Sequence, residues 1–148
     1  MSSIRKIEKQ DYSQWLKLWN LYLEFYGHEL SEEVKLATFQ RIVYANSGMR
    51  AFVYEKDGEI AGIVHFIYHA STWSLGNYCY LQDLYVLESH RNSGIATQLI
   101  EAVYRDAEEH NASRVYWLTH ESNKTAIKLY EKVADNAGFL QFRKNFKQ

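Results

Sequence analysis

The stretch that decides the fold runs from Leu84-Tyr85-Val86 through a short polar link to Arg91-Asn92-Ser93-Gly94-Ile95-Ala96. Residues of strand type lead into a glycine-containing turn, and an apolar helical pattern follows the turn. Such a turn directs several backbone N–H groups at one point, and the helix dipole adds partial positive charge there. We therefore expect a binding site for a phosphate or pyrophosphate, where Gly94 allows close approach of the backbone.

The spacing Arg91-x-x-Gly94-x-Ala96 differs from two common phosphate loops. The dinucleotide-binding fingerprint is Gly-x-Gly-x-x-Gly, and the P-loop requires Gly-Lys followed by Ser or Thr. The spacing resembles instead the acyl-CoA pyrophosphate loop, Gln/Arg-x-x-Gly-x-Gly/Ala, of the GNAT family of N-acetyltransferases. The resemblance implies that acetyl-CoA binds along the strand end, the turn and the helix start. The residues concerned are Leu84, Tyr85, Val86, Arg91, Asn92, Ser93, Gly94, Ile95, Ala96 and Thr97.

A surface helix that follows a glycine and binds nothing would carry a similar pattern, so a second motif matters. Asn123 is followed by Ala126 and Tyr130, and Gly138-Phe139 comes after them. This resembles the GNAT pattern in which an Asn opens the fourth helix and a Tyr lies two turns further on. The resemblance implies that Asn123 and Tyr130 contact acetyl-CoA, and that Tyr130 is the general acid that protonates the departing thiolate. A phenol with a pKa of about 10 stays protonated at neutral pH and can do this. The alternative is a tyrosine packed in the core.

Hydrophobic periodicity predicts a mixed α/β fold in the order β-α-α-β-β-β-α-β-α-β. Asp11, with Gln14 three residues on, is expected to cap the first helix, Ser31 the second and Asn123 the last. Asp57-Gly58 predicts a tight hairpin turn. The expected strands are 3–7, 50–55, 60–68, 78–87, 114–119 and 139–143, and the expected helices are 11–27, 31–43, 93–110 and 123–133.

The resemblance adds detail to the sheet. It implies a GNAT fold with a central mixed, mostly antiparallel sheet that is flanked by helices. Its fourth and fifth strands splay apart at a bulge, and the pantetheine arm of CoA fills the gap by pairing with exposed backbone groups. We expect one domain over residues 1–148, since this length suits a single core.

Composition limits the partners. The formal net charge of −1, from 17 basic and 18 acidic residues, argues against nucleic-acid binding, and no apolar run is long enough to span a membrane. The lone Cys79 lies in an apolar strand pattern, which predicts a core residue of a cytoplasmic protein. No set of ligating side chains has metal-site spacing, so no metal is expected. The 16% aromatic content fits an interface between subunits, and the resemblance to a family whose members often dimerise implies a homodimer.

The sequence leaves the general base open. The strand sequence Tyr80-Leu81-Gln82-Asp83 resembles the Tyr-Leu-Glu-Asp sequence of polyamine acetyltransferases, but Gln82 cannot accept a proton. The acceptor could lose its proton through water or to Asp83, or it could arrive as a neutral amine. His65, His69 and His120 are further candidates, although a histidine chosen from sequence alone is more often a packing or surface residue.

The first helix gives the clue to the acceptor. Its aromatic residues resemble those of a branch that includes polyamine-type and histone-tail-type acetyltransferases, although most of them also fit a core-facing stripe. Aromatic rings and a carboxylate would favour a cationic amine. The candidate acceptor residues are Tyr22, Tyr26, Glu29, Trp73 and Gln82.

Two functions are consistent with these motifs. The first is an enzyme that moves the acetyl group of acetyl-CoA to a primary amine by direct attack in a ternary complex, without an acyl-enzyme. The second is a non-catalytic acetyl-CoA-binding module with a sensing or protein-interaction role. Tyr130 favours the enzyme, because a CoA binder needs no phenol at the thiol. The acceptor stays open among polyamines, amino acids, aminoglycosides and protein lysines.

Overall fold

The computed structural model describes residues 1–45 and 47–147, so that Asn46 and Gln148 lie outside it. The chain divides into two compact units, Met1–Leu118 and Thr119–Gln148, and each is described by itself. The single domain over residues 1–148 stays a prediction.

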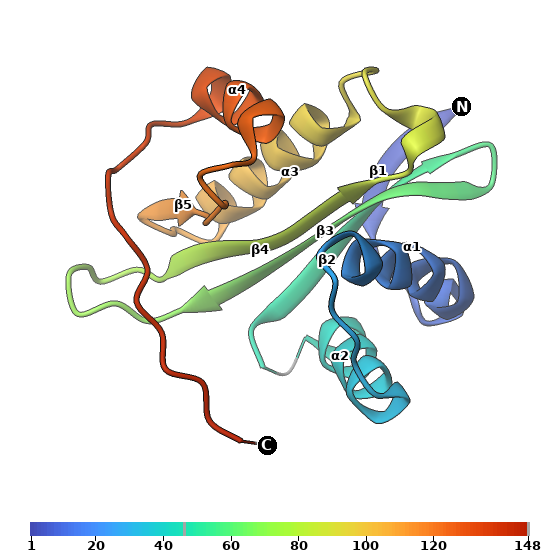
Figure 1. Ribbon diagram of the computed structural model, residues 1–148, viewed down its shortest axis with the longest axis horizontal. Coiled ribbons are helices and arrows are strands. Elements are labelled where there is room, and N and C mark those ends of the chain that lie inside the picture. Colours follow the sequence, from blue (N-terminus) through green and yellow to red (C-terminus); the bar gives the residue numbers. More distant parts are fainter. Residues whose placement is uncertain (46, 148) are drawn as a thin grey trace. The chain divides into compact units, whose positions relative to one another are not determined.

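A five-stranded sheet forms the centre of the first unit (Figure 1). The strands lie in sequence order, the first three neighbouring pairs are antiparallel, and only the last pair, β4 with β5, is parallel. This confirms the expected mixed, mostly antiparallel sheet. The strands are β1 Ser2–Lys6, β2 Met49–Lys56, β3 Glu59–His69, β4 Tyr78–Val86 and β5 Arg114–Tyr116.

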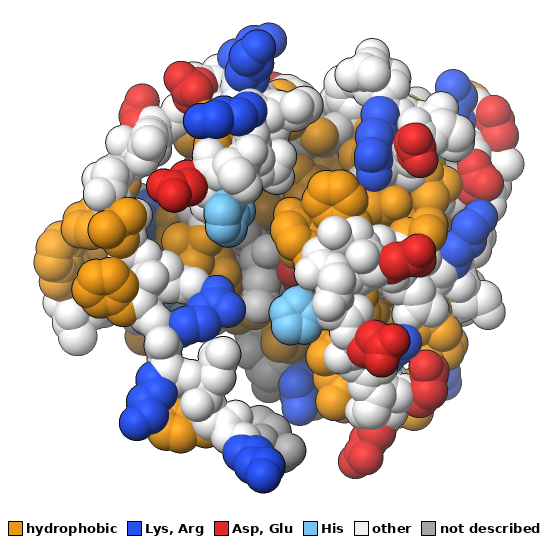
Figure 2. Space-filling view, in the orientation of Figure 1, with side chains coloured by type: hydrophobic (Ala, Val, Ile, Leu, Met, Phe, Trp, Pro, Cys, Tyr) orange, Lys and Arg blue, Asp and Glu red, His pale blue; other side chains and the backbone are white. Residues whose placement is uncertain are grey.

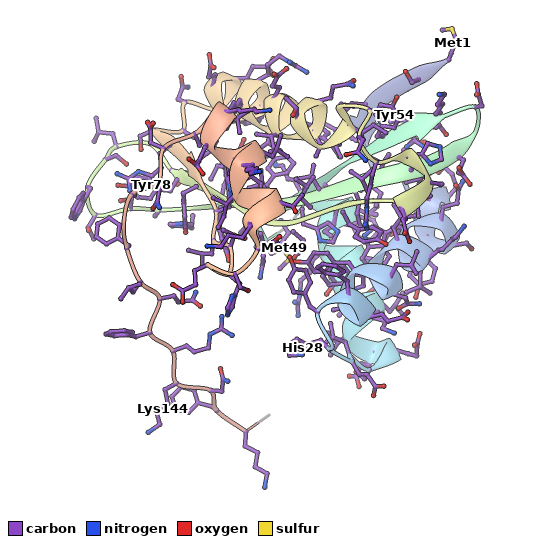
Figure 3. All side chains as sticks on the ribbon, turned by 45° about the horizontal axis from the view of Figure 1, so that its top comes forward. Met1, His28, Met49, Tyr54, Tyr78 and Lys144 are labelled. Carbon is purple, nitrogen blue, oxygen red and sulfur yellow. The ribbon has the colours of Figure 1, made fainter. Side chains whose placement is uncertain are left out.

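The predicted hairpin joins β2 to β3. Asp57 and Gly58 have φ angles of 52° and 81°, which is the left-handed pair of a turn whose twist matches that of the strands. Register then places Tyr54 of β2 opposite Gly62, and it places Tyr78 of β4 opposite His69. Tyr54 and Tyr78 therefore lie toward opposite ends of the sheet (Figure 3).

Helices cover both faces of this sheet. α1 (Tyr12–Phe25) and α2 (Glu32–Tyr44) lie on one face and α3 (Ile95–Glu109) on the other (Figure 1). Two single turns of 3-10 helix, η1 (Lys9–Asp11) and η2 (Glu88–His90), precede α1 and α3. Trp15 and Leu18 of α1 and Leu99 of α3 are almost fully buried against the strands. On the outer side of α1 and α2, apolar side chains lie exposed among charged ones (Figure 2).

The predicted cap of α2 is confirmed, but the predicted cap of α1 is wrong. Ser31 Oγ accepts from the N–H of Val34, as an N-cap does. Asp11 makes no side-chain cap to α1. Its carboxylate accepts instead from the Glu8 N–H at 2.7 Å and from the Arg5 guanidinium at 2.7 and 3.0 Å. The Arg5 guanidinium therefore ties η1, which ends at Asp11, to β1.

The reach of Gln14 also differs from the prediction. Its amide oxygen accepts from the Ile60 N–H at 2.8 Å, and its amide nitrogen donates to the Gly58 carbonyl at 3.3 Å. Gln14 therefore ties α1 to the β2–β3 hairpin and takes no part in a capping box. Local spacing alone could not distinguish these partners, because the hairpin lies more than forty residues further along the chain.

The second unit contains one helix, α4 (Lys124–Val133). Asn123 stands at its N-cap position, but its side chain makes no capping hydrogen bond. Its φ and ψ of −81° and 69° lie outside the extended region of a side-chain cap, and its backbone carbonyl accepts from the Ile127 N–H instead. The strand expected over residues 139–143 is wrong: residues 135–147 form neither helix nor strand. A strand needs a partner strand, and the described part of this unit contains none.

The Arg5–Asp11 pair yields a prediction about stability. Burial would raise the pKa of the Asp11 carboxyl, but the hydrogen bonds from Arg5 and from the Glu8 backbone outweigh burial and lower it from 3.8. A lowered pKa in the folded state means that the stabilisation is complete above the ordinary value and is lost as pH falls through the folded-state pKa. We expect Asp11→Ala to lower the free energy of unfolding at pH 7 by about 2 kcal/mol, because it removes the buried carboxylate that accepts from Arg5 and from the Glu8 N–H, and Arg5 then keeps only its weaker partners.

Urea unfolding followed across acid pH checks this expectation. The difference between wild type and Asp11→Ala should close as pH falls through the folded-state pKa of Asp11. Asp57→Asn is the matched control, because it removes another paired carboxylate whose ion pair is exposed, and it should leave the unfolding midpoint nearly unchanged. An Asp11→Ala variant as stable as wild type at neutral pH would contradict the role given to this pair.

Candidate functional site

The distinctive feature of the sheet is that β5 covers only the start of β4. The pairs are Tyr78 with Arg114, Cys79 with Val115 and Tyr80 with Tyr116. Among the described residues, no strand pairs with residues 81–86 on this side. Backbone groups along this part of β4 can therefore bind an extended ligand as a strand would, and the expected splay of the fourth and fifth strands is confirmed.

A β-bulge lies where β4 parts from β5. Phe66 of β3 faces Leu81, but the next residue back, His65, faces Asp83. Gln82 is thus the extra residue, and its side chain is exposed. Because a bulge shifts the alternation of side chains by one, Asp83 and Tyr85 lie on the face of the sheet that carries α1.

The turn after β4 has the geometry that the sequence predicted. Asn92 and Gly94 have φ angles of 63° and 80°, and Gly94 occupies the N-cap position of α3. Arg91 turns back toward the strand: its Nε donates to the Val86 carbonyl at 3.0 Å, and its guanidinium lies 5.4 Å from the centre of the Tyr85 ring. Arg91 therefore fixes the turn on the strand end, and the Val86 carbonyl is already engaged.

The start of α3 can bind an anion. Its first-turn N–H groups, those of Ile95, Ala96 and Thr97, have no intrahelical carbonyl to bind, as at any helix N-terminus. The helix has fifteen residues, so its dipole places partial positive charge at this end. Gly94 is exposed, and the nearest atom to an added Cβ would be Gln98 Nε2 at 3.9 Å. A phosphate can therefore approach the backbone closely.

Three side chains form a hydrogen-bonded chain between α1, β3 and β4. The indole N–H of Trp15 donates to His65 Nε2 at 2.9 Å, and His65 Nδ1 lies 3.0 Å from Asp83 Oδ2. Trp15 is completely buried and His65 is 5% exposed. The Asp83 side chain retains 14% exposure, so it forms the outer end of the chain.

Aromatic rings of α1 surround this chain. Trp19 lies over His65 with their centres 4.9 Å apart, and it stacks on Tyr22 at 5.1 Å. Tyr22 in turn contacts Tyr26 at 4.9 Å and Tyr85 at 6.4 Å. Partial burial and the nearby Asp83 carboxylate raise the pKa of the Tyr26 phenol, which stays a proton donor at neutral pH. The structure thus brings Tyr22 and Tyr26 together beside Asp83.

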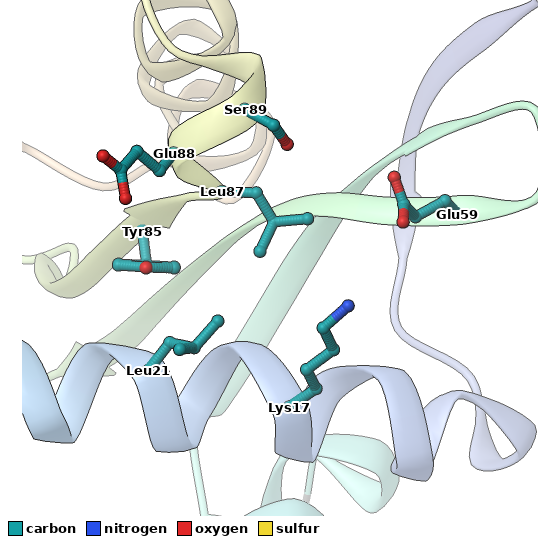
Figure 4. Close-up of a pocket in the computed structure, with 7 residues that line it drawn as sticks. All are labelled: Lys17, Leu21, Glu59, Tyr85, Leu87, Glu88 and Ser89. Carbon is teal, nitrogen blue, oxygen red and sulfur yellow. The ribbon is translucent and has the colours of Figure 1, made fainter.

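A pocket opens beyond Tyr85, between α1 and the end of β4 (Figure 4). Leu21 and Tyr85 supply apolar surface, whereas the charged groups of Lys17 and Glu59 point into the same space (Figure 4). The pocket thus continues from the Tyr85 ring toward one positively charged residue, Lys17, and one negatively charged residue, Glu59. Its full lining is Lys17, Leu21, Glu59, Tyr85, Leu87, Glu88 and Ser89.

Two of the candidate acceptor residues, Trp73 and Glu29, lie in exposed loops. Trp73 is 82% exposed in the loop between β3 and β4, and its ring makes no aromatic contact within the described part of the chain. Glu29 lies exposed between α1 and α2. His69, a candidate base, bonds to the Ala70 carbonyl through Nδ1 and to the Tyr116 hydroxyl through Nε2.

The second motif lies in the other unit. Asn123 precedes α4 and Tyr130 lies within it, two turns further on. Ile127 and Tyr130 recur at the spacing of one helix face. His120, the remaining histidine candidate, accepts through Nδ1 from the Ser122 N–H at 3.1 Å and lies 2.7 Å from the Ser122 hydroxyl.

Cys79 is the buried core residue that the sequence predicted. It is inaccessible to solvent, and burial raises the pKa of its thiol to about 12, so it is not a nucleophile at neutral pH. Within residues 1–45 and 47–147, no cluster of three or more ligating side chains could hold a metal ion. No helix of the described chain has the length and apolar character needed to cross a membrane.

The sequence did not predict the hydrogen-bonded link between Trp15, His65 and Asp83. The three residues are separated by 50 and 18 positions, so no local spacing connects them. A candidate base needs a free ring nitrogen, yet both ring nitrogens of His65 are engaged inside the protein. Strand alternation places His65 on the face toward α1, but only the bulge at Gln82 brings Asp83 opposite it.

Comparison with known proteins connects these features. The acetyltransferase (GNAT) family model matches residues 15–134, which extend across both units. The D-amino-acid N-acetyltransferase HPA3 of Saccharomyces cerevisiae is 34% identical over 145 residues, which cover 96% of this chain and 89% of the relative. A thialysine N-epsilon-acetyltransferase of Caenorhabditis elegans is 32% identical over 128 residues, covering 78% of this chain and 79% of the relative.

Solved structures agree on the fold. AAC(6')-Iy, in complex with the bisubstrate analogue CoA-S-monomethyl-acetylneamine, superposes with a TM-score of 0.86 at 20% identity and covers 99% of each chain. A possible acetyltransferase from Clostridium difficile 630 also has a TM-score of 0.86 and 20% identity, covering 100% of this chain and 99% of that one. By its family model and its relatives, this chain belongs to the acetyltransferase (GNAT) family.

Proposed function

We propose that this protein transfers the acetyl group of acetyl-CoA to a primary amine, by direct attack in a ternary complex. One observation carries the proposal beyond family membership: the part of β4 that pairs with no described strand on this side leads, through η2 and the turn at Gly94, to the N-terminus of α3. A free strand edge suits the amides of a pantetheine arm, and the helix start suits its pyrophosphate.

The reaction makes three demands on the protein. The acceptor ammonium must lose a proton, so that its nitrogen lone pair can attack the thioester carbonyl carbon. The C–S bond must then break, and the thiolate must gain a proton. A backbone N–H near the carbonyl can stabilise the oxyanion between these events. Proximity in the ternary complex supplies much of the remaining rate enhancement.

We assign the cofactor to the residues named from the sequence motif. The backbone of Leu84 and its neighbours in β4 would bind the pantetheine amides, and the turn from Arg91 to Thr97 would bind the pyrophosphate. Asn123 and Tyr130 would contact the arm from α4, where Tyr130 would protonate the thiolate. Family membership and the spacing of these two residues support their roles.

Asp83 is the proposed proton acceptor. It lies beside the bulge, on the face of β4 that carries the α1 aromatics. Gln82 is exposed next to it and can hydrogen-bond the acceptor without taking a proton. His65 is a poor alternative, since Trp15 occupies the lone pair of Nε2.

The proposed acceptor is a primary amine that carries positive charge. Tyr22 and Tyr26 offer ring faces, and the Asp83 carboxylate supplies the opposite charge, a combination that favours cations. The relatives are named for D-amino acids and for thialysine, both of which contain amines. No finding favours a non-catalytic binding module. Thiol release measured with spermidine, thialysine, D-amino acids, sisomicin and a lysine peptide decides the matter, and its absence with every amine would refute the proposed enzyme.

Gly94→Glu tests the cofactor site. The substitution puts a negative charge where the pyrophosphate would bind, and it forces a side chain onto a residue with φ of 80°. We expect acetyl-CoA affinity, measured by calorimetry, to fall about tenfold or more, which corresponds to at least ~1.4 kcal/mol. Gly58→Glu is the matched control, because Gly58 has nearly the same φ and equally open space around it. Equal acetyl-CoA affinity in wild type and Gly94→Glu would place the cofactor elsewhere.

Tyr130→Phe tests the general acid. The hydroxyl would act on sulfur only as the C–S bond breaks, so its loss should lower kcat and leave acetyl-CoA affinity nearly intact. General acid catalysis contributes about 10²–10⁴-fold, which sets the expected drop. The drop should shrink at high pH, where thiolate leaves without help. Tyr44→Phe, which removes an exposed phenol of α2, is the control. Wild-type rates in Tyr130→Phe across the pH range would remove Tyr130 from the mechanism.

We also propose a cytoplasmic homodimer. The lone thiol is reduced and buried, and α1 and α2 expose the large apolar side chains of Phe25, Leu36 and Tyr44, which suit a protein interface. We expect light scattering to give the mass of a dimer both with and without reductant, because Cys79 cannot reach a partner. A dimer that separates into monomers when reductant is added would contradict this expectation.

A further inference from the structure

We propose that Trp15 and His65 are positioning residues that hold the Asp83 carboxylate in place to receive the proton of the acceptor ammonium. This inference rests on the proposed function, because it assigns a supporting structure to its proton acceptor. It gives the buried histidine a role other than that of the base itself.

The direction of the hydrogen bonds follows from the chemistry of Trp15. An indole nitrogen can only donate, so His65 Nε2 must accept across the 2.9 Å contact. A ring nitrogen that accepts carries no proton, and the single proton of the neutral ring therefore lies on Nδ1. From there it is donated to Asp83 Oδ2 at 3.0 Å. Trp15 thus selects the one tautomer that can bind the carboxylate.

Burial of the Trp15 and His65 side chains strengthens the preference for this tautomer. Trp15 and Trp19 pack around the His65 ring, with Trp19 4.9 Å from its centre. Both indoles are at least nine-tenths buried, so water cannot replace the hydrogen bond between Trp15 and His65. In such surroundings, an unmade hydrogen bond costs about 1–3 kcal/mol. The ring is therefore held in one orientation.

The arrangement leaves half of the carboxylate available. His65 engages Oδ2, and among the described residues Asp83 Oδ1 has no hydrogen-bond partner. The Asp83 side chain keeps 14% of its surface exposed, and Tyr22, Tyr26 and Tyr85 lie around it. A primary ammonium can bind Oδ1 and pass a proton to it, directly or through one water, and its nitrogen lone pair is then free to attack the thioester carbon.

Three substitutions separate positioning from mere packing. His65→Leu removes both hydrogen bonds. His65→Asn keeps an amide N–H near the place of Nδ1, so it can still donate to Asp83. Trp15→Phe retains a ring but removes the donor that fixes the tautomer. Tyr68→Phe is the control, because it deletes a partly buried hydrogen bond, that of Tyr68 to Asp106 at 2.6 Å, from the side of the sheet that faces α3.

We expect His65→Leu to lower kcat about 10–100-fold with the best amine of the panel, as misplacement of a reacting group does. The KM for acetyl-CoA should not change. His65→Asn should recover most of the loss, Trp15→Phe should lose severalfold, and Tyr68→Phe should match wild type. Wild-type kcat in His65→Leu, or equal kcat in the Leu and Asn variants, would overturn the positioning role.

A spectroscopic measurement tests the tautomer without turnover. The ¹⁵N chemical shifts of the His65 ring at pH 7 should show a protonated Nδ1 and an unprotonated Nε2 in wild type, and exchange between both tautomers in Trp15→Phe. A protonated Nε2 in wild type would overturn the proposal. Failure of the proposed function is a distinct result: it would appear as no thiol release from wild type with any amine, whatever the ¹⁵N shifts.

Discussion

One extra residue in β4, Gln82, determines on which face of the sheet the Asp83 carboxylate lies. Side chains alternate along a strand, so Cys79 and Leu81 both lie on the face that carries α3. Regular alternation would put Asp83 on that face as well. The bulge at Gln82 inverts the alternation, and Asp83 and Tyr85 come to lie beside His65, Tyr22 and the rest of α1. A one-residue change of register thus moves a carboxylate from the core beneath α3 to the aromatic face.

The same strand therefore offers two different surfaces. Its edge has no partner strand beyond Tyr80 among the described residues, and the strand leads through the turn at Gly94 to the N-terminus of α3. Its face presents Asp83 among aromatic rings. A thioester placed along the edge and an amine placed on the face would meet across the thickness of a single strand. Direct transfer between two bound substrates requires such closeness, and no side chain needs to carry the acetyl group.

The sequence predicted the parts of this arrangement that depend on local patterns. The hairpin at Asp57-Gly58, the cap at Ser31 and the turn at Gly94 each follow from residues a few positions apart. The sequence did not predict hydrogen-bond partners that lie far apart along the chain or outside the expected motif. Gln14 binds the hairpin, and Asp11 binds Arg5, although local spacing predicted a capping box. The strand expected over residues 139–143 has the right residue types but no partner strand in its own unit, and a strand is a property of a pair.

The candidate site likewise contains a part that local patterns predict and a part that depends on long-range contacts. Motif spacing led to the turn from Arg91 to Thr97, where the backbone conformation is encoded by the glycine itself. The acceptor side was predicted less completely: Tyr22 and Tyr26 lie beside Asp83, whereas Trp73 and Glu29 lie exposed in loops. Trp15 is a fully buried residue of the amphipathic helix α1. The positioning role proposed for it depends on a His65 nitrogen 50 positions away, which no pattern in the helix could reveal.

The His65–Asp83 pair contains the same groups as the histidine and aspartate of a hydrolase triad, but their order is reversed. In the triad, the carboxylate is buried behind the imidazole, and the free imidazole nitrogen meets the reacting group. Here the Trp15 N–H occupies that nitrogen, and the other oxygen of the carboxylate has no hydrogen-bond partner within the described part of the chain. An acceptor amine arrives at neutral pH as an ammonium ion, which an imidazole could deprotonate but would not attract. A carboxylate does both, because its negative charge first binds the cation and then accepts its proton. The proposed cationic acceptor and the proposed role of Asp83 as proton acceptor would therefore both follow from the Trp15–His65 hydrogen bond.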